Sequence, residues 1–384
     1  MKKTLARIFS VALVLVMAVA TLASCGGSAK NYAENNTEYF IGATGPLTGD
    51  ASSYGISVNN GAKLAIKEIN AKGGLNGKFF KYEMKDDQAT AAAAASGYDA
   101  LYEAGMQISI GAVTSGACES FASKAEENNL LFMTPSASTA SVISDRSNGF
   151  RICFGDPDQG VLAARNIAAK YTKVGVIYDT SSDYSKGVYD AFAAEMNKLG
   201  KSFTAKTFDA ENNKDFSAQV EALKDCDVIF LPIYYTEAGL IAKMAVSKGC
   251  NAVLFGCDGF DGIKDQITNK ETGELEVSNK IMYITPFDAN STDPTVKSFV
   301  DAYKAEYNLL PDQFAADGYD AVYAIYNAMK AANVDNVTIS PSDLCDIVRA
   351  KLTESTFKFK GATGEMTWNE KGEPTKVPQI VEFN

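Results

Sequence analysis

The feature that most constrains this fold is a repeated order of short apolar strands and helices, clearest in residues 106–139. Met106–Gly111 is an apolar run that ends in glycine, as a buried parallel strand does. A hydroxylated loop, Thr114–Ala117, leads into a predicted helix over about Cys118–Asn128. A second apolar strand follows over Leu130–Thr134. The segment therefore predicts a β-α-β unit with two parallel strands.

The same alternation continues on both sides of this unit. Further strands, separated by predicted helices, are expected over Tyr39–Ala43, Phe80–Met84, Arg151–Phe154, Val174–Tyr178, Ser202–Phe208, Val228–Pro232, Ala252–Cys257 and Ile281–Thr285, with a final strand over Val377–Phe383. Strands that alternate with helices predict a parallel, doubly wound α/β sheet. These strands exceed what one open sheet of this length usually holds, so we expect two α/β lobes.

Hydroxyl-bearing loops follow the two strands of the central unit. Thr114 and Ser115 follow the first, and Pro135–Thr139 follows the second. The carboxyl ends of parallel strands meet at the edge where open α/β sheets bind ligands, and loop amides at a helix start attract anions. Serine also caps helices, so either loop alone could be an ordinary turn. Two such loops one β-α-β unit apart favour a site for a small carboxylate.

Composition excludes several classes of function. The formal net charge is −11, and residues 1–24 hold three basic residues and no acid, so a processed chain would be more acidic still. This argues against nucleic acid as a partner. The chain has no histidine. This removes Ser-His-Asp and Cys-His catalysis and the common histidine zinc sites, so we expect no enzyme, no cofactor and no metal.

The N-terminus has the pattern of an export signal. Lys2, Lys3 and Arg7 precede an apolar stretch that is too short for a membrane span. Residues 1–24 are interpreted as a signal peptide that ends in Leu-Ala-Ser before Cys25, which resembles the bacterial lipobox. Cys25 is therefore the predicted lipidation site, and residues 25–37 are a predicted lipidated tether. The other cysteines lie in separate elements beside apolar runs, and we expect free thiols.

Taken in order, the motifs of the mature chain resemble those of the leucine/isoleucine/valine-binding proteins of ABC transporters, which are type I periplasmic binding proteins. The resemblance covers about residues 39–384 and rests on Ile41–Gly49, Asn60–Gly74, Ile110–Ser115, Thr134–Ser138, Asp215–Ser217, Asp317–Ala321 and Gly361–Gly364. None of these motifs is decisive alone; their order and spacing together are specific.

The resemblance implies two doubly wound α/β lobes joined by a hinge of three crossovers. The crossovers would fall near Phe154–Asp158, Thr285–Asp288 and Asn369–Lys376. Lobe 1 would comprise residues 38–156 and 287–370, and lobe 2 residues 157–286 and 371–384.

The resemblance also implies where a ligand binds. Ser115 and Ser138 would bind a carboxylate, while the Ser136 carbonyl and Asp258 would bind an ammonium group. Asp258 stands where the family often has glutamate, and Ser138 where it often has threonine. The implied site comprises Ser115, Ser136, Ala137, Ser138, Tyr184, Tyr234, Asp258 and, at the rim, Tyr54. From the residues alone, Asp258 could equally cap a helix at Gly259.

The function implied is an extracytoplasmic solute-binding lipoprotein that delivers an α-amino acid, branched-chain or otherwise apolar, to a membrane permease. It would be a monomer, anchored through Cys25 to the outer face of the cytoplasmic membrane or periplasmic. One alternative keeps the fold but binds a short amide, urea or an aromatic acid. Another is a module that senses a ligand rather than transporting it. A third is an enzyme that uses carboxylate, lysine or tyrosine chemistry.

Overall fold

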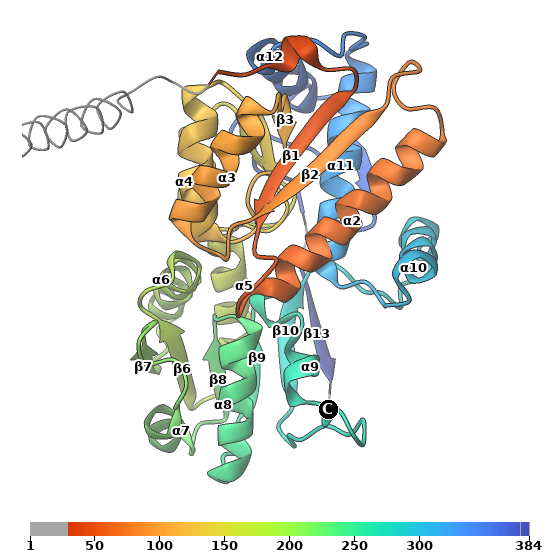
Figure 1. Ribbon diagram of the computed structural model, residues 1–384. Coiled ribbons are helices and arrows are strands. Elements are labelled where there is room, and N and C mark those ends of the chain that lie inside the picture. The colour runs from red at the N-terminus through yellow and green to blue at the C-terminus, as the bar shows by residue number, and fades with distance from the viewer. Residues whose placement is uncertain (1–29, 377, 384) are drawn as a thin grey trace, which may run out of the picture.

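The computed structural model describes residues 30–376 and 378–383 as two α/β lobes, one above the other (Figure 1). Lobe 1, as named here, is built on a five-stranded parallel sheet in the order β2-β1-β3-β4-β5. Its strands are β1 (Tyr39–Gly45), β2 (Phe80–Asp86), β3 (Ile108–Ser109), β4 (Phe132–Thr134) and β5 (Gly149–Arg151). Every residue of the inner strand β1 is buried, as expected for a parallel strand covered on both faces.

Helices cover both faces of this sheet. They are α2 (Ser52–Ala71), α3 (Ala91–Glu103), α4 (Ser115–Glu127), α11 (Gln313–Ala331) and α12 (Pro341–Leu352), while α10 (Pro294–Tyr307) packs outside them against α2. Local sequence sets several helix starts: the side chains of Thr90, Asp293, Asp312 and Ser340 each accept a hydrogen bond from a backbone N–H of the first turn. Proline at the start of α10 and of α12 supports the same boundaries.

Lobe 2 is built on a six-stranded sheet in the order β13-β10-β9-β8-β6-β7. Its strands are β6 (Val174–Asp179), β7 (Thr204–Phe208), β8 (Val228–Leu231), β9 (Val253–Gly256), β10 (Ile281–Thr285) and β13 (Gln379–Phe383), and only β13 is antiparallel to its neighbour. Its helices are α5 (Asp156–Lys170), α6 (Asp183–Lys198), α7 (Ser217–Leu223), α8 (Tyr235–Ser247) and α9 (Ile263–Ile267).

Shorter elements complete the described chain. They are the 3₁₀ turns η1 (Ala33–Asn35), η2 (Ala140–Val142) and η3 (Asp258–Phe260) and the hairpin of β11 (Phe359–Gly361) and β12 (Gly364–Met366). The chain passes between the sheets after β5, after β10 and before β13, so the expected two lobes with three crossovers are confirmed. The lobe ranges 38–156 with 287–370 and 157–286 with 371–384 stay a prediction.

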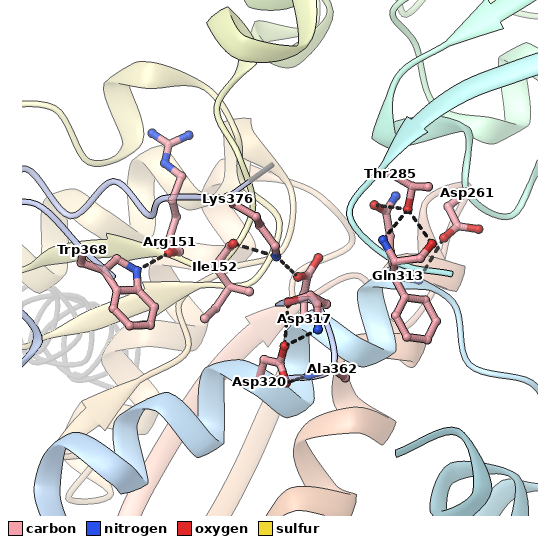
Figure 2. Close-up of polar contacts among 12 residues, drawn as sticks. Arg151, Ile152, Asp261, Thr285, Gln313, Asp317, Asp320, Ala362, Trp368 and Lys376 are labelled. Atoms are coloured by element: carbon pink, nitrogen blue, oxygen red, sulfur yellow. Dashed lines mark hydrogen bonds and ion pairs between the residues drawn. The ribbon is translucent and has the colours of Figure 1, made fainter. Parts of the chain in front are cut away.

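Polar contacts hold the crossovers against lobe 1 (Figure 2). Lys376 Nζ lies 2.7 Å from Asp317 Oδ1 on α11 and donates to the carbonyl of Ile152 at 2.9 Å. Both charged side chains are 2% exposed. The indole N–H of Trp368 donates to the Arg151 carbonyl at 2.7 Å. The first and third crossovers are thus joined to each other and to α11.

Several boundaries differ from the sequence expectation. Helix α4 begins at Ser115, not at about Cys118, because Thr114 has the extended backbone of an N-cap and the helical turn starts directly after it. The last strand begins at Gln379, and Val377 lies outside the described residues. Cys118, Cys153, Cys226, Cys250, Cys257 and Cys345 are free, as expected.

No helix in residues 30–376 or 378–383 is long and apolar enough to cross a membrane. The predicted signal peptide and Cys25 lie outside the described residues. The assigned lipid anchor therefore stays a prediction.

Candidate ligand-binding cleft between the lobes

A small cavity lies where the two lobes meet. Lobe 1 and lobe 2 both contribute its lining residues, which are Tyr54, Val113, Thr114, Ser115, Ser136, Tyr184, Tyr234, Asp258, Gly259 and Phe314. Its volume is about 10 Å³, roughly the space that one water needs. The lobes are therefore closed around the site, and a small molecule could enter only if they separated.

The lobe 1 wall is made by the loops after β3 and β4. Ser115 stands in the first turn of α4, and its Oγ accepts hydrogen bonds from the backbone N–H groups of Ser138 (3.3 Å) and Thr139 (3.4 Å). Ser136 Oγ donates to the Val113 carbonyl at 2.6 Å. These contacts join the loop after β3 to the loop after β4. The two loops and the first backbone N–H groups of α4 therefore form one wall of the cavity.

Thr114 Oγ1 is a buried hydroxyl at this wall that has no hydrogen-bond partner in the described structure. A buried hydroxyl without a partner costs free energy, and such groups are often satisfied by a ligand or water. The wall therefore offers hydroxyl donors and a helix N-terminus, which is the donor set that a carboxylate needs.

The opposite wall carries the only charged side chain in the cavity lining, that of Asp258. Asp258 follows β9 and opens the turn η3. Its Oδ1 accepts from the Tyr184 hydroxyl at 2.7 Å and from the Gly259 N–H at 2.8 Å. Its own N–H donates to Gln159 Oε1 at 3.0 Å. Burial raises the pKa of the Asp258 carboxyl to about 6, although these hydrogen bonds lower it in part.

Aromatic rings fill the space beside these polar walls. Tyr54, on α2 of lobe 1, donates its hydroxyl to the Gly259 carbonyl of lobe 2 at 2.5 Å and accepts from the Tyr235 N–H at 3.2 Å. Its ring centroid lies 4.4 Å from that of Phe314 and 5.2 Å from that of Tyr234. Tyr234 in turn stacks on Tyr184 at 5.1 Å. Tyr54 thus crosses between the lobes.

Most of the site residues expected from the sequence come together here. Ser115, Ser136, Tyr184, Tyr234, Asp258 and Tyr54 line the cavity. Ala137 and Ser138 do not line it; both lie buried behind Ser136, where they hold the loop. Asp258 is the first residue of a 3₁₀ turn whose N-cap is Cys257, and no side chain caps that turn, so the interpretation of Asp258 as a cap is wrong.

Thr114 belongs to the hydroxylated loop that the sequence already indicated, whereas the lining residues Val113, Gly259 and Phe314 were not expected. Val113 and Gly259 lie within two residues of predicted site residues, so their neighbourhood could have indicated them. Phe314 precedes the Asp317–Ala321 motif by three residues, but only the packing of α11 against α2 brings it to the cleft. Among the described residues, no cluster of three or more cysteines and acids could hold a metal ion.

Comparison with known proteins agrees with this architecture. Residues 38–382 match the family described as periplasmic binding protein. The Leu/Ile/Val-binding protein BraC3 of Rhizobium johnstonii is 29% identical over 343 residues, which is 87% of this chain and 88% of that protein.

Two solved structures share the fold. LivJ of Streptococcus pneumoniae, a branched-chain amino acid substrate-binding protein in complex with isoleucine, superposes with a TM-score of 0.73 at 28% identity, covering 90% of this chain and 100% of LivJ. A solute-binding protein of an R. palustris ABC transporter, in complex with benzoate, gives a TM-score of 0.76 at 16% identity, covering 90% and 93%. The second likeness concerns the fold alone. With a family match over nearly its whole described length and the same two-lobed fold, the chain belongs to the periplasmic binding protein family.

Proposed function

We propose that this protein binds an α-amino acid, branched-chain or otherwise apolar, and presents it to the membrane permease of an ABC transporter. The observation that carries the proposal is the opposition of two walls across one cavity. The first turn of α4, with Ser115, forms one wall, and Asp258 stands in the other. A zwitterion needs uncharged donors for its carboxylate and a charged acceptor for its ammonium group, and these walls supply both.

The assignment of roles follows from the chemistry of each wall. Thr114, Ser115 and the amides of α4 would bind the carboxylate, and Asp258 with the Ser136 carbonyl would bind the ammonium group. Tyr184 would hold Asp258 in place through its 2.7 Å hydrogen bond. Val113, Phe314 and the rings of Tyr54 and Tyr234 would contact the ligand side chain, which favours an apolar one.

Binding would act through lobe closure. A ligand held by Ser115 on one side and Asp258 on the other contacts both lobes only when they are closed, so it stabilises the closed state. The permease would then recognise the closed form. Family membership implies a location outside the cytoplasm, and anchoring through Cys25 would keep the protein at the membrane.

The relatives are solute-binding proteins, and the sequence lacks histidine, so we propose no catalytic role. A sensing role would use the same closure, but it needs a signalling partner in place of a permease. Binding of L-leucine to a purified permease–protein complex and its uptake into vesicles would separate transport from sensing.

A thermal-shift screen of the amino acids, short amides, urea and small acids tests the ligand class. A ligand at 100 times its Kd should add about 2.7 kcal/mol to the free energy of unfolding. We expect L-leucine, L-isoleucine or L-valine to shift the unfolding midpoint upward and to give a 1:1 calorimetric titration. A screen in which only benzoate or amides stabilise the protein would contradict the proposal.

The benzoate complex of the distant structural relative favours a second candidate, a simple carboxylic acid. A matched set of ligands separates the two. L-leucine carries both charges, 4-methylpentanoate lacks the amino group, and leucinamide lacks the carboxylate. An amino-acid site should bind L-leucine far more tightly than either analogue, whereas an acid site should bind 4-methylpentanoate at least as well.

A further inference from the structure

One buried glutamine connects the two lobes beside the proposed ligand site. Gln313 is the first residue of α11 in lobe 1 and is 1% exposed. Its Nε2 donates to the carbonyl of Asp258 at 2.7 Å, and its backbone N–H donates to Asp261 Oδ2 at 2.9 Å. Both acceptors belong to lobe 2, so these bonds cross the interface; Figure 2 shows the one to Asp261.

The other end of the same amide reaches the hinge. Gln313 Oε1 accepts from Thr285 Oγ1 at 3.2 Å, and Thr285 is the last residue of β10, where the second crossover begins. One planar amide thus contacts the turn that carries Asp258 and the segment about which the lobes move. Gln313 does not line the cavity and would not touch a ligand.

We propose that Gln313 is a positioning residue that couples lobe closure to the placement of Asp258. The role rests on the proposed ligand site: closure brings the Gln313 amide to the Asp258 carbonyl, which fixes the turn in the position from which the carboxylate faces Ser115. Without the amide, the closed state keeps the Tyr54–Gly259 bond to this turn but loses the bond to Asp258 itself, and the ligand is released sooner.

A second glutamine provides the contrast. Gln159, on α5 of lobe 2, accepts from the N–H of the same Asp258 at 3.0 Å. It therefore holds the turn from within its own lobe. Gln313 thus bonds the backbone carbonyl of Asp258, and Gln159 bonds its backbone N–H. Only the Gln313 bond joins different lobes, so only this bond would form when the lobes close and break when they open.

The first experiment measures ligand binding by native protein, Gln313→Met, Gln159→Met and Gln219→Met, with L-leucine as the probe. Methionine keeps the volume and removes the amide. Gln219 is a control, because it bonds only the Thr207 carbonyl on the surface of lobe 2. Gln313→Met should speed L-leucine dissociation by about 5- to 30-fold, with little change in the association rate. Gln219→Met should match native protein.

The unfolding midpoint without ligand separates positioning from a structural role. Gln313→Met should lower the midpoint of the liganded protein but hardly change that of the ligand-free protein, in which the lobes are free to open. An equal loss in both states, or a dissociation rate within twofold of native, would overturn the proposal. If Gln313→Met does not fold, Thr285→Val removes one bond of the same amide and should act in the same direction.

A cross-linking experiment measures lobe closure without any ligand. It therefore tests the role of Gln313 even if the protein binds no amino acid. A Cβ on Gly116 of α4 would lie 3.6 Å from Asp183 Oδ2 on α6 of the other lobe. Gly116→Cys with Asp183→Cys should form a disulfide in the closed state, with oxidised glutathione accepting the electrons and protons of the two thiols.

Adding Gln313→Met should slow this cross-linking several-fold, while adding Gln159→Met should leave the rate unchanged. Equal rates for all three proteins would overturn the role of Gln313. If Gln313→Met slows cross-linking but the native protein does not bind L-leucine, the role of Gln313 is supported and the ligand assignment is rejected.

Discussion

At the residue scale, the site depends on where single charges and hydroxyls lie. Asp258 is 5% exposed, and its carboxylate is the only formal charge in the cavity lining. No lysine or arginine is among those lining residues, so an anionic group there must be bound by hydroxyls and by the N-terminus of α4. The single negative charge and the uncharged donors lead us to two predictions about binding.

Asp258→Asn should weaken amino-acid binding by roughly 30- to several-thousand-fold, because the ligand ammonium loses its charged partner in a closed cleft. Ser138→Ala should cost less, since the Ser138 side chain does not line the cavity. Titration calorimetry with the best amino acid measures both. Asp265→Asn, at an exposed position on α9, is the control. If Asp258→Asn binds the amino acid within threefold of the native affinity, Asp258 does not belong to the ligand site.

Binding should also depend on pH. Burial raises the pKa of Asp258 to about 6. Only the ionised carboxylate attracts an ammonium group, so affinity should be nearly constant above pH 7 and fall as the pH drops through 6, by up to about tenfold per unit for one proton. Calorimetry from pH 5 to pH 8 measures the slope. Affinity that rises on acidification would contradict the assignment.

At the scale of elements, the long helices α2 and α11 form the main support of lobe 1. They approach so closely that a Cβ on Gly61 would lie 1.9 Å from the Ala315 carbonyl oxygen, and one on Gly318 would lie 2.5 Å from that of Val58. Glycine at these positions lets the backbones meet. This contact also sets where Tyr54 and Phe314, one on each helix, face the cleft.

Gly61→Ala should therefore destabilise the ligand-free protein by about 1–3 kcal/mol, because the added methyl forces the two helices apart. Urea unfolding followed by circular dichroism measures this. Gly116→Ala is the matched helical control: its Cβ would meet no atom closer than 3.6 Å, so helix propensity should make it neutral or slightly stabilising. Equal stability of both variants would refute the packing argument.

The crossover segments depend on a buried ion pair. Lys376→Met should cost about 3–5 kcal/mol, because it leaves the Asp317 carboxylate buried without its partner. Lys297→Met is the control, since the side chains of the Lys297–Asp301 pair are 67% and 64% exposed, and exposed pairs contribute about 0–1 kcal/mol. Unfolding free energies in urea compare the two. Equal losses would show that the Lys376 pair has no special role.

At the scale of the whole molecule, two lobes meet over an aromatic and polar cleft, and the chain crosses between them three times. This arrangement permits a hinge motion that leaves both cores intact. The N-terminal part of described lobe 1 is fixed by contacts such as that of Asn31 Nδ2 with the Tyr102 carbonyl at 2.8 Å. Residues 31–36 belong to the predicted tether of residues 25–37, but they are bonded to lobe 1 through Asn31 and Asn36. A tether would therefore lie ahead of residue 31 and attach the protein through lobe 1.

Cys25→Ala should release the protein from the membrane, because the acyl chains that the lipobox predicts would have no attachment site. Fractionation of cells that express each form measures this, and mass spectrometry of the native N-terminus identifies the modification. Cys226→Ala, a change of another cysteine, should leave the protein in the membrane fraction. Retention of Cys25→Ala there would show that the anchor assignment is wrong.

The sequence by itself determined the α/β alternation, the two lobes and the loops that end at the cleft, because periodicity, glycine and cap residues act within a few residues of one another. Ser115, Ser136 and Asp258 lie in loops that follow predicted strands, and the resemblance to the family assigned each of them to the site. The sequence located β3 and the start of α4 less well: β3 comprises only Ile108–Ser109, and α4 begins directly after its N-cap Thr114.

Only the tertiary structure decided how the lobes meet. The Tyr54–Gly259 bond joins residues 205 apart, and the Gln313–Asp258 bond joins residues 55 apart in different lobes. Neither leaves a pattern in the local sequence, because each depends on the angle between two sheets. The same angle sets the cavity volume and brings Phe314 into its lining. The sequence specifies the walls of the site, and the packing of one lobe on the other specifies the space between them.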